Sequence, residues 1–295
     1  MKPKEINKTM AQPSTFHQFI RFGTDAYGLE RLLRFFQSIS QILASYPLLS
    51  HNLIYLLSTQ LPFALLFPAT PKSYMILTTP VLLALRARLA LARRFFRIFR
   101  FLDAFDSAYG AATGSGAPGL GGAEGWLEFG AKVCNGFYLL LESLTLLDDM
   151  GVAGQGGWDG VLGAKRAMEW NIEGQRFWFL SLVCGILLGL IRLWKLSDAG
   201  KGVKVKGEKK DVTDKRKPKD DGEIRRKRRE EKGKMRKLWR KLVADVMDLA
   251  GPGKVVGWLP VDSGVVGILM LGSTWLTGME VWERCGKEVA LMAGR

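Results

Sequence analysis

The chain has 295 residues, of which 47% are hydrophobic and 24% are charged, and its net charge at pH 7 is +15. This length suits one large domain or two small ones. Residues 195–241 hold 21 Lys and Arg against 9 Asp and Glu, so +12 of the net charge lies in that one segment. Because the excess is local, the composition argues against a nucleic-acid-binding surface spread over the whole chain.

Residues that commonly carry chemistry are sparse. The three cysteines lie far apart, two of them within apolar stretches, which argues against a disulfide framework and fits a reducing compartment. His17 and His51 have no Cys or His partner at metal-ligand spacing. No motif places a nucleophile, a base or a metal in context, so we predict no enzyme, no catalytic residue, no metal and no cofactor.

The N-terminal part of the chain is predicted to be helical and amphipathic. Residues 1–23 form a polar lead without the apolar region of a secretory signal. Apolar residues recur at helical spacing from residue 24 to about 45, at the start of a helical region over 24–109. Residues 46–71 contain no Asp, Glu, Lys or Arg but four prolines. They predict a short apolar helix at about 50–60 and an irregular connection, interfacial or buried rather than spanning.

Residues 80–109 are the strongest functional candidate. Thr79 can cap a helix, Pro80 suits its first position, and no further Pro or Gly precedes Gly110, so an uninterrupted helix is predicted. A core helix with a solvated basic face is the alternative, but six arginines with a single acid between residues 81 and 105 favour a helix that lies in a lipid interface. The residues predicted to bind membrane are basic on one face and apolar on the other: Arg86, Arg93, Arg94, Arg97 and Arg100, and Leu91, Phe95, Ile98, Phe99 and Leu102.

The middle of the chain combines a linker with the first candidate span. Residues 110–125 are rich in Gly and Ala and predicted to be a flexible tether; their Gly-x-Gly-x-x-Gly spacing lacks the preceding strand that a dinucleotide site needs. Residues 126–194 are predicted to be helical. Glu142 argues against a span in the first part, whereas 177–194 predict a membrane span, with a buried soluble helix as the alternative. Gly185 and Gly189 form a small-residue pair that lets a second helix approach closely.

The C-terminal part begins with the basic segment. Residues 195–235 are predicted to be disordered, and attraction to anionic lipid headgroups explains their charge more economically than nuclear import or nucleic-acid binding. Residues 236–285 are predicted to form an amphipathic helix and a second span at 264–282, with Gly267 and Gly272 on its packing surface. The predicted fold class is therefore all-α: a membrane-associated helical protein with amphipathic N-terminal helices and about two C-terminal transmembrane helices.

Three regions, in this order and spacing, resemble the peroxin-11 family and its fungal members in particular. The stretch from Thr24-Asp25 through Gly28 to Gln37 looks like the family's N-terminal Thr-Asp-Gly helix. Residues 91–103 are similar to its Arg-Lys-x-Phe-Arg…Phe-Leu element. The third region is the last span with the residues that lead into it, and the likeness there is carried by Gly257-Trp-Leu259, Val266-Gly-Ile-Leu269 and Trp282. In addition, Arg176-Phe-Trp178 fits the family's connector before the first span.

The resemblance implies a protein of the peroxisomal membrane that elongates and tubulates this membrane and so promotes peroxisome fission and proliferation. The partners implied are an anionic phospholipid membrane, further copies of the chain (a homo-oligomer), and a dynamin-like GTPase with its fission adaptor; no nucleic acid is expected. The competing function is a peroxisomal membrane pore or transporter for small metabolites.

Overall fold

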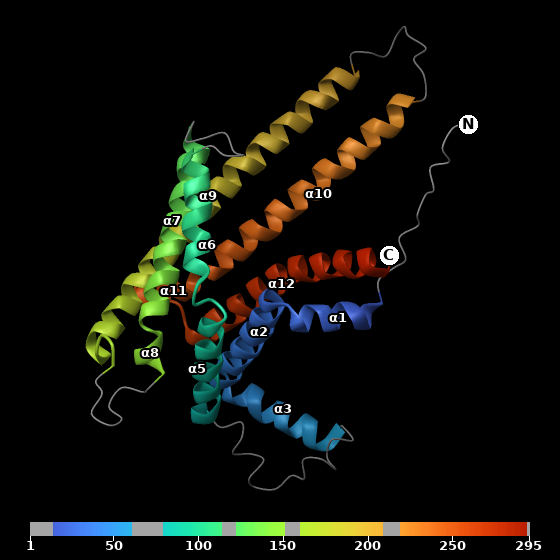
Figure 1. Ribbon diagram of the computed structural model, residues 1–295. Coiled ribbons are helices and arrows are strands. Elements are labelled where there is room, and N and C mark those ends of the chain that lie inside the picture. Colours follow the sequence, from blue (N-terminus) through green and yellow to red (C-terminus); the bar gives the residue numbers. More distant parts are fainter. Residues whose placement is uncertain (1–13, 61–78, 114–121, 151–159, 209–218, 294–295) are drawn as a thin grey trace. The chain divides into compact units, whose positions relative to one another are not determined.

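A computed structural model describes residues 14–60, 79–113, 122–150, 160–208 and 219–293. Every regular element in these ranges is a helix, which confirms the predicted fold class (Figure 1). The helices are α1 (Thr15–Thr24), α2 (Ala26–Ser45), α3 (Pro47–Gln60), α5 (Thr79–Phe95), α6 (Arg100–Thr113), α7 (Ala123–Leu144), α8 (Leu146–Asp149), α9 (Ala164–Glu208), α10 (Lys219–Asp248), α11 (Ala250–Val256) and α12 (Ser263–Ala293).

The chain divides into two compact units. The first comprises Met1–Phe96 and Met270–Arg295, and the second comprises Arg97–Leu269. The division falls within the stretch predicted to be one continuous helix, between α5 and α6. It also falls within α12, so the second candidate span begins in one unit and ends in the other.

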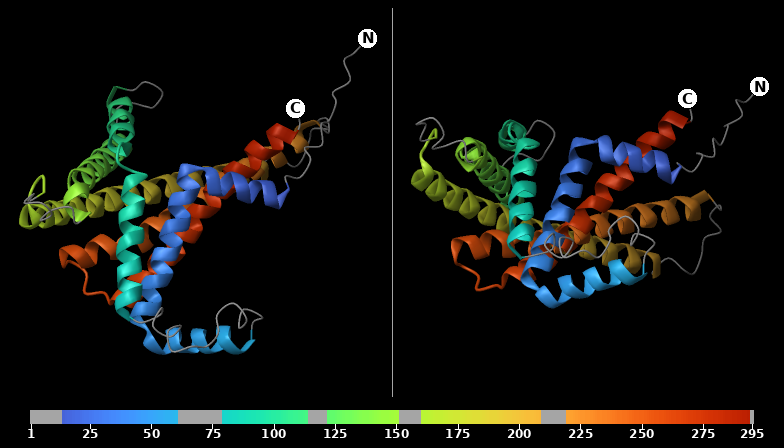
Figure 2. Two further views of the ribbon diagram at one scale, coloured as in Figure 1. Left: turned by 60° about the horizontal axis from the view of Figure 1, so that its bottom comes forward. Right: turned by 90° about the horizontal axis from the view of Figure 1, so that it is seen from below.

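In the first unit α5 packs along α2, and the two helices run in opposite directions (Figure 2). Leu82 near the start of α5 is buried against Leu43 and Ala44 near the end of α2. A salt bridge joins Arg93 near the end of α5 to Glu30 near the start of α2. This pairing gives α5 one inward face and leaves its other side exposed.

The junction of α1 and α2 explains the Thr-Asp-x-x-Gly pattern. The Asp25 carboxylate accepts a hydrogen bond from the Gly28 N–H at 3.1 Å and so caps α2. A Cβ on Gly28 would lie 2.0 Å from the Phe22 carbonyl oxygen, so only glycine allows the two helices to approach this closely. The predicted helix from residue 24 is thus confirmed, with its cap at Asp25.

The same junction contacts the C-terminal part of α12. The Gln18 side chain donates a hydrogen bond to the Trp282 carbonyl at 2.8 Å, and the Phe22 and Trp282 rings lie 5.7 Å apart. Arg284 pairs with Asp25 at 2.5 Å. Segments more than 250 positions apart in sequence are therefore held together within the first unit.

In the second unit α7 and α9 form the main helix pair, and α6, α10 and α11 pack around them. The Ser181 hydroxyl donates to the Ala131 carbonyl at 2.8 Å, and the Tyr138 and Trp178 rings stack at 5.2 Å. At the other end of the pair, Arg192 and Lys195 form ion pairs with Glu128 and Glu124. α7 therefore accompanies the whole apolar stretch of α9.

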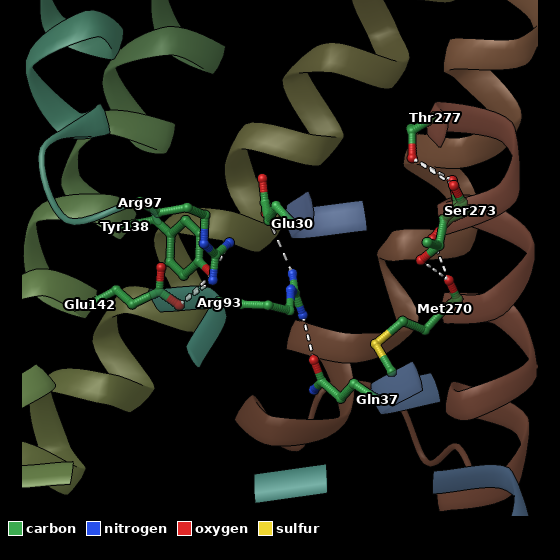
Figure 3. Close-up of polar contacts among 10 residues, drawn as sticks. Glu30, Gln37, Arg93, Arg97, Tyr138, Glu142, Met270, Ser273 and Thr277 are labelled. Carbon is green, nitrogen blue, oxygen red and sulfur yellow. Dashed lines mark hydrogen bonds and ion pairs between the residues drawn. The ribbon is translucent and has the colours of Figure 1, made fainter. Parts of the chain in front are cut away.

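Two helices of the described residues, α9 and α12, are long and apolar enough to cross a membrane. Only 17% of the most apolar window of α9 and 28% of that of α12 are buried, whereas a core helix of a soluble protein is mostly buried. In α12 the Thr277 hydroxyl donates to the Ser273 carbonyl at 2.7 Å (Figure 3). The Thr274 hydroxyl donates to the Met270 carbonyl at 2.6 Å, so both hydroxyls are satisfied within the helix.

The basic segment differs from its prediction. α9 continues to Glu208 and α10 begins at Lys219, so much of the segment predicted to be disordered is helical; residues 209–218 lie outside the described residues. Lys, Arg and Glu are good helix formers, and pairs such as Arg226 with Glu230 support an isolated helix. The prediction of disorder came from the high charge and the scarcity of large apolar residues. It did not take into account that these charged residues favour a helix locally.

Candidate membrane interface

The helix predicted to be continuous over 80–109 is broken. α5 ends at Phe95, residues 96–99 form a turn, and α6 begins at Arg100 and continues past Gly110 to Thr113. The break is held from outside, because the Ser143 hydroxyl donates to the Ile98 carbonyl at 2.8 Å, and that carbonyl is one that a continuous helix would have used. No Pro or Gly marks this position, so the prediction of one uninterrupted helix was wrong for a tertiary reason.

Arg97, in the turn, is bound inside the second unit. Its guanidinium forms an ion pair with Glu142 at 2.6 Å and donates to the Tyr138 hydroxyl at 3.4 Å (Figure 3). The Tyr138 hydroxyl also donates to Glu142 at 3.1 Å, so one carboxylate serves both partners. The side chains of Arg97 and Glu142 are only 12% and 8% exposed. Glu142, which interrupts an apolar stretch in sequence, thus has a buried cationic partner.

Arg93, one turn earlier, is bound inside the first unit. It donates to the Gln37 side-chain oxygen at 2.6 Å and lies 3.7 Å from the Glu30 carboxylate (Figure 3). Its side chain is 10% exposed and that of Glu30 is 4% exposed. Two of the five arginines predicted to face lipid phosphates therefore face protein carboxylates instead.

The remaining arginines of the predicted basic face are more accessible. Arg86 is exposed, and Arg94 and Arg100 are partly exposed. The five arginines are therefore not all available to one surface. Arg93 and Arg97 are largely buried, whereas the other three are exposed or partly exposed.

The apolar residues around the turn are largely uncovered. Phe95 is 47%, Phe99 is 69% and Leu102 is 56% exposed, whereas Leu91 and Ile98 are partly buried. Phe96, which the helical projection did not assign to the apolar face, is also 40% exposed. Phe96 directly follows Phe95 in the sequence, but at 100° per residue it falls outside the apolar face of a continuous helix.

The glycines that were predicted to let a second helix approach the first span lie against α10. A Cβ on Gly185 would lie 3.3 Å from the Asp245 carboxylate, and one on Gly189 would lie 3.3 Å from Leu242, so α10 packs against this surface of α9. Of the glycines predicted in the second span, Gly267 is buried and Gly272 is partly buried. Their contact with another helix stays a prediction.

Two features of the described residues concern metal binding and thiol reactivity. These residues contain no group of three or more His, Cys, Asp or Glu side chains that could hold a metal ion. Cys134, Cys184 and Cys285 are free thiols, and burial raises the pKa of the Cys134 thiol, which opposes nucleophilic reactivity.

Comparison with known proteins gives one match. The sequence matches the family described as Peroxisomal biogenesis factor 11 (PEX11) over residues 73–282, more than half of the chain, while searches of curated proteins and of solved structures gave no match. The match does not concern the source organism, so the likeness to fungal members stays a prediction. This family consists of peroxisome biogenesis factors and is not a known enzyme family, and the two span-capable helices are consistent with a location in the peroxisomal membrane. The chain belongs to the peroxisomal biogenesis factor 11 family.

Proposed function

We propose that this protein binds and remodels the peroxisomal membrane, elongating and tubulating it before fission, and that the turn between α5 and α6 is the part that enters the lipid. The observation that carries this proposal is the exposure of Phe95, Phe99 and Leu102 next to arginines that are turned inward. Phe95 belongs to the first unit, and Phe99 and Leu102 belong to the second. Large apolar side chains exposed in this way are unfavourable in water and mark surfaces that contact a partner or a membrane.

The energy available supports interfacial binding. Full burial of a Leu or Phe side chain contributes about 1.5–3 kcal/mol. Phe95, Phe96, Phe99 and Leu102 are roughly half exposed, so their insertion contributes about 3–6 kcal/mol together. Such a gain supports reversible insertion into one leaflet, which expands that leaflet and favours curvature.

The arginines divide into two roles under this proposal. Arg93 binds Gln37 of α2 within the first unit, and Arg97 binds Glu142 of α7 within the second, so both have structural partners. Arg86 is exposed and Arg94 and Arg100 are partly exposed, and guanidinium groups at accessible positions are suited to bind lipid phosphates. Under this proposal lipid binding depends on three arginines, whereas the continuous helix predicted from the sequence would have provided five.

Anchoring and assembly complete the proposal. α9 and α12 cross the bilayer and keep the turn at its surface, and self-association concentrates many turns on one membrane area. A dynamin-like GTPase and its fission adaptor are the expected partners of the elongated membrane; the family resemblance is what supports these two partners.

The test uses the full chain reconstituted in vesicles that contain anionic phospholipid. A triple variant, Phe95→Ser, Phe99→Ser and Leu102→Ser, is expected to insert through α9 and α12 but to lose tubulation seen by electron microscopy. The matched control replaces three other exposed apolar residues, Phe16, Leu291 and Met292, by Ser and should tubulate normally. Undiminished tubulation by the first variant would refute the proposed role of the turn.

One contact favours the competing function, a pore or transporter for small metabolites. The apolar stretch of α9 has no charge of its own between Phe177 and Ile191, but the Lys241–Asp245 ion pair of α10 lies against Gly185 in the middle of it. Charged groups beside a span are common along transport paths. Conductance measurements on the same reconstituted chain distinguish the two functions, because a membrane-bending protein need not pass ions.

A further inference from the structure

A shallow cavity of about 460 Å³, widely open to the surface, lies between α9 and α10 within the second unit. α9 contributes Arg192, Lys195 and Leu196, and α10 contributes Lys234, Lys237 and Leu238. The wall is formed almost wholly by carbon atoms, so the aliphatic stems of the basic side chains and the two leucines line the cavity while the charged groups lie at its rim. Such a cavity suits a ligand that is anionic at one end and apolar at the other.

The cations at the rim are not equally available. Arg192 pairs with Glu128 at 2.6 Å, and Lys195 pairs with Glu124, so α7 already neutralises the α9 side. Among the described residues neither Lys234 nor Lys237 has an acidic partner. Two ammonium groups therefore remain for an anion on the α10 side of the cavity.

The position of the cavity along α9 indicates where it meets a bilayer. The span predicted in α9 runs from Phe177 to Trp194, with Arg192 near its end, and its rise of about 27 Å is close to the thickness of a hydrocarbon core. Trp194 on α9 and Trp239 on α10 are 70% and 52% exposed. Exposed tryptophans beside basic residues at the end of an apolar stretch are typical of the headgroup level.

We propose that this cavity binds one anionic glycerophospholipid, with its phosphate between Lys234 and Lys237 and its glycerol and upper acyl chains along Leu196 and Leu238. A free phosphate would gain nothing from the carbon-lined wall, which is why the lipid is the occupant that the geometry favours. The bound lipid would hold the α9–α10 pair at the membrane surface. This site is separate from the turn between α5 and α6 and does not depend on the function proposed for that turn.

The experiment uses the full chain in phosphatidylcholine nanodiscs that contain about 10% of a photoactivatable phosphatidylglycerol, with crosslinked peptides identified by mass spectrometry. Crosslinks are expected on residues 192–196 and 234–238. Replacing both Lys234 and Lys237 by Gln should reduce these crosslinks about tenfold. The matched control, Lys232→Gln with Arg236→Gln, removes the same charge from exposed positions that do not line the cavity and should leave the crosslinks within about twofold of the wild type.

A second measurement separates loss of the site from loss of the fold. Crosslinks from a photoactivatable phosphatidylcholine to the apolar stretch of α9 should be the same in both variants. An equal loss of anionic-lipid crosslinks in both variants would show general attraction to charge and would overturn the proposal. Displacement of the lipid by added inorganic phosphate would show a free-anion site and would also overturn it.

Discussion

Arg93 and Arg97 illustrate how a charge pattern is redistributed when a chain folds. Both belong to the basic face of the helical projection, yet each is buried beside a carboxylate from another helix. A buried charge is tolerated only when it is paired and hydrogen-bonded. The sequence contained the partners, Glu30 and Glu142, but their spacing of 63 and 45 residues from the arginines gave no signal of the pairing.

Removal of the Glu142 carboxylate tests the buried cluster. Glu142→Ala leaves the Arg97 guanidinium without its counter-charge, so we expect the free energy of unfolding to fall by about 3–5 kcal/mol. Thermal unfolding of the detergent-solubilised protein, followed by circular dichroism, measures the change. The double variant Arg97→Met with Glu142→Leu removes both charges and should recover most of the loss; a cost below about 1 kcal/mol for the single variant would contradict the pairing.

Gly28 gives a second test at the residue level. The Cβ of Gly28→Ala would meet the Phe22 carbonyl at 2.0 Å, so the α1–α2 junction must shift, and we expect a loss of stability of about 1–3 kcal/mol. Gly23 is the matched control, because a Cβ there has no atom within 4 Å and alanine suits a helix better than glycine. Gly23→Ala should leave the unfolding temperature unchanged or slightly higher, and equal destabilisation by both variants would contradict the geometry.

At the scale of elements, the break between α5 and α6 is the feature that local sequence could not predict. Helix propensity is favourable throughout residues 80–109, and the first and last residues of the helical stretch were predicted to within a few positions. The turn at 96–99 forms because contacts from Ser143, Glu142 and Tyr138 of α7 are available only in the folded unit. The periodicity of a sequence describes one helix at a time, so it cannot show that contacts from another helix replace the helix's own hydrogen bonds.

Glu128, which pairs with Lys132 of the same helix and with Arg192 of α9, predicts a pH dependence of stability. The Lys132 ammonium, followed by Arg192, lowers the pKa of Glu128 below its usual value of about 4.3. The ionised form is thus favoured in the folded state. This contribution to stability is present above the usual pKa and is lost as the pH falls through the lowered value.

Glu128→Gln should therefore destabilise the protein at neutral pH, and the difference from the wild type should shrink as the pH falls below about 4. Unfolding temperatures measured across this range check the expectation. Lys132→Met should produce the same change in the pH profile, because it removes the main cause of the lowered pKa. A difference that stayed constant down to the lowest pH would contradict the assignment.

At the scale of the whole molecule, the contacts between α1, α2 and the C-terminal part of α12 constrain topology. Gln18 donates a hydrogen bond to the Trp282 carbonyl, and Asp25 pairs with Arg284. The α1–α2 junction and the C-terminal part of α12 must therefore lie on the same side of a membrane. The two crossings that we propose for α9 and α12 satisfy this requirement.

The prediction is that tags at the two ends of the chain behave alike. Protease added to intact peroxisomes should remove both tags or neither, and both should be removed after the membrane is permeabilised. Removal of one tag alone would be incompatible with the contacts in the first unit. The loop between the spans, which contains the basic segment, should show the opposite accessibility.

Composition and periodicity alone determined that this protein is helical, that α9 and α12 are apolar enough to span a membrane, and that basic and aromatic residues concentrate near residue 95. These properties depend on neighbours within a few turns of helix, which the order of residues records directly. Tertiary structure alone decided which arginines turn inward, where the long helix breaks, and that α10 covers the glycines of α9. Those outcomes depend on partners many tens of residues away, whose approach is set by packing and by the cost of burying an unpaired charge.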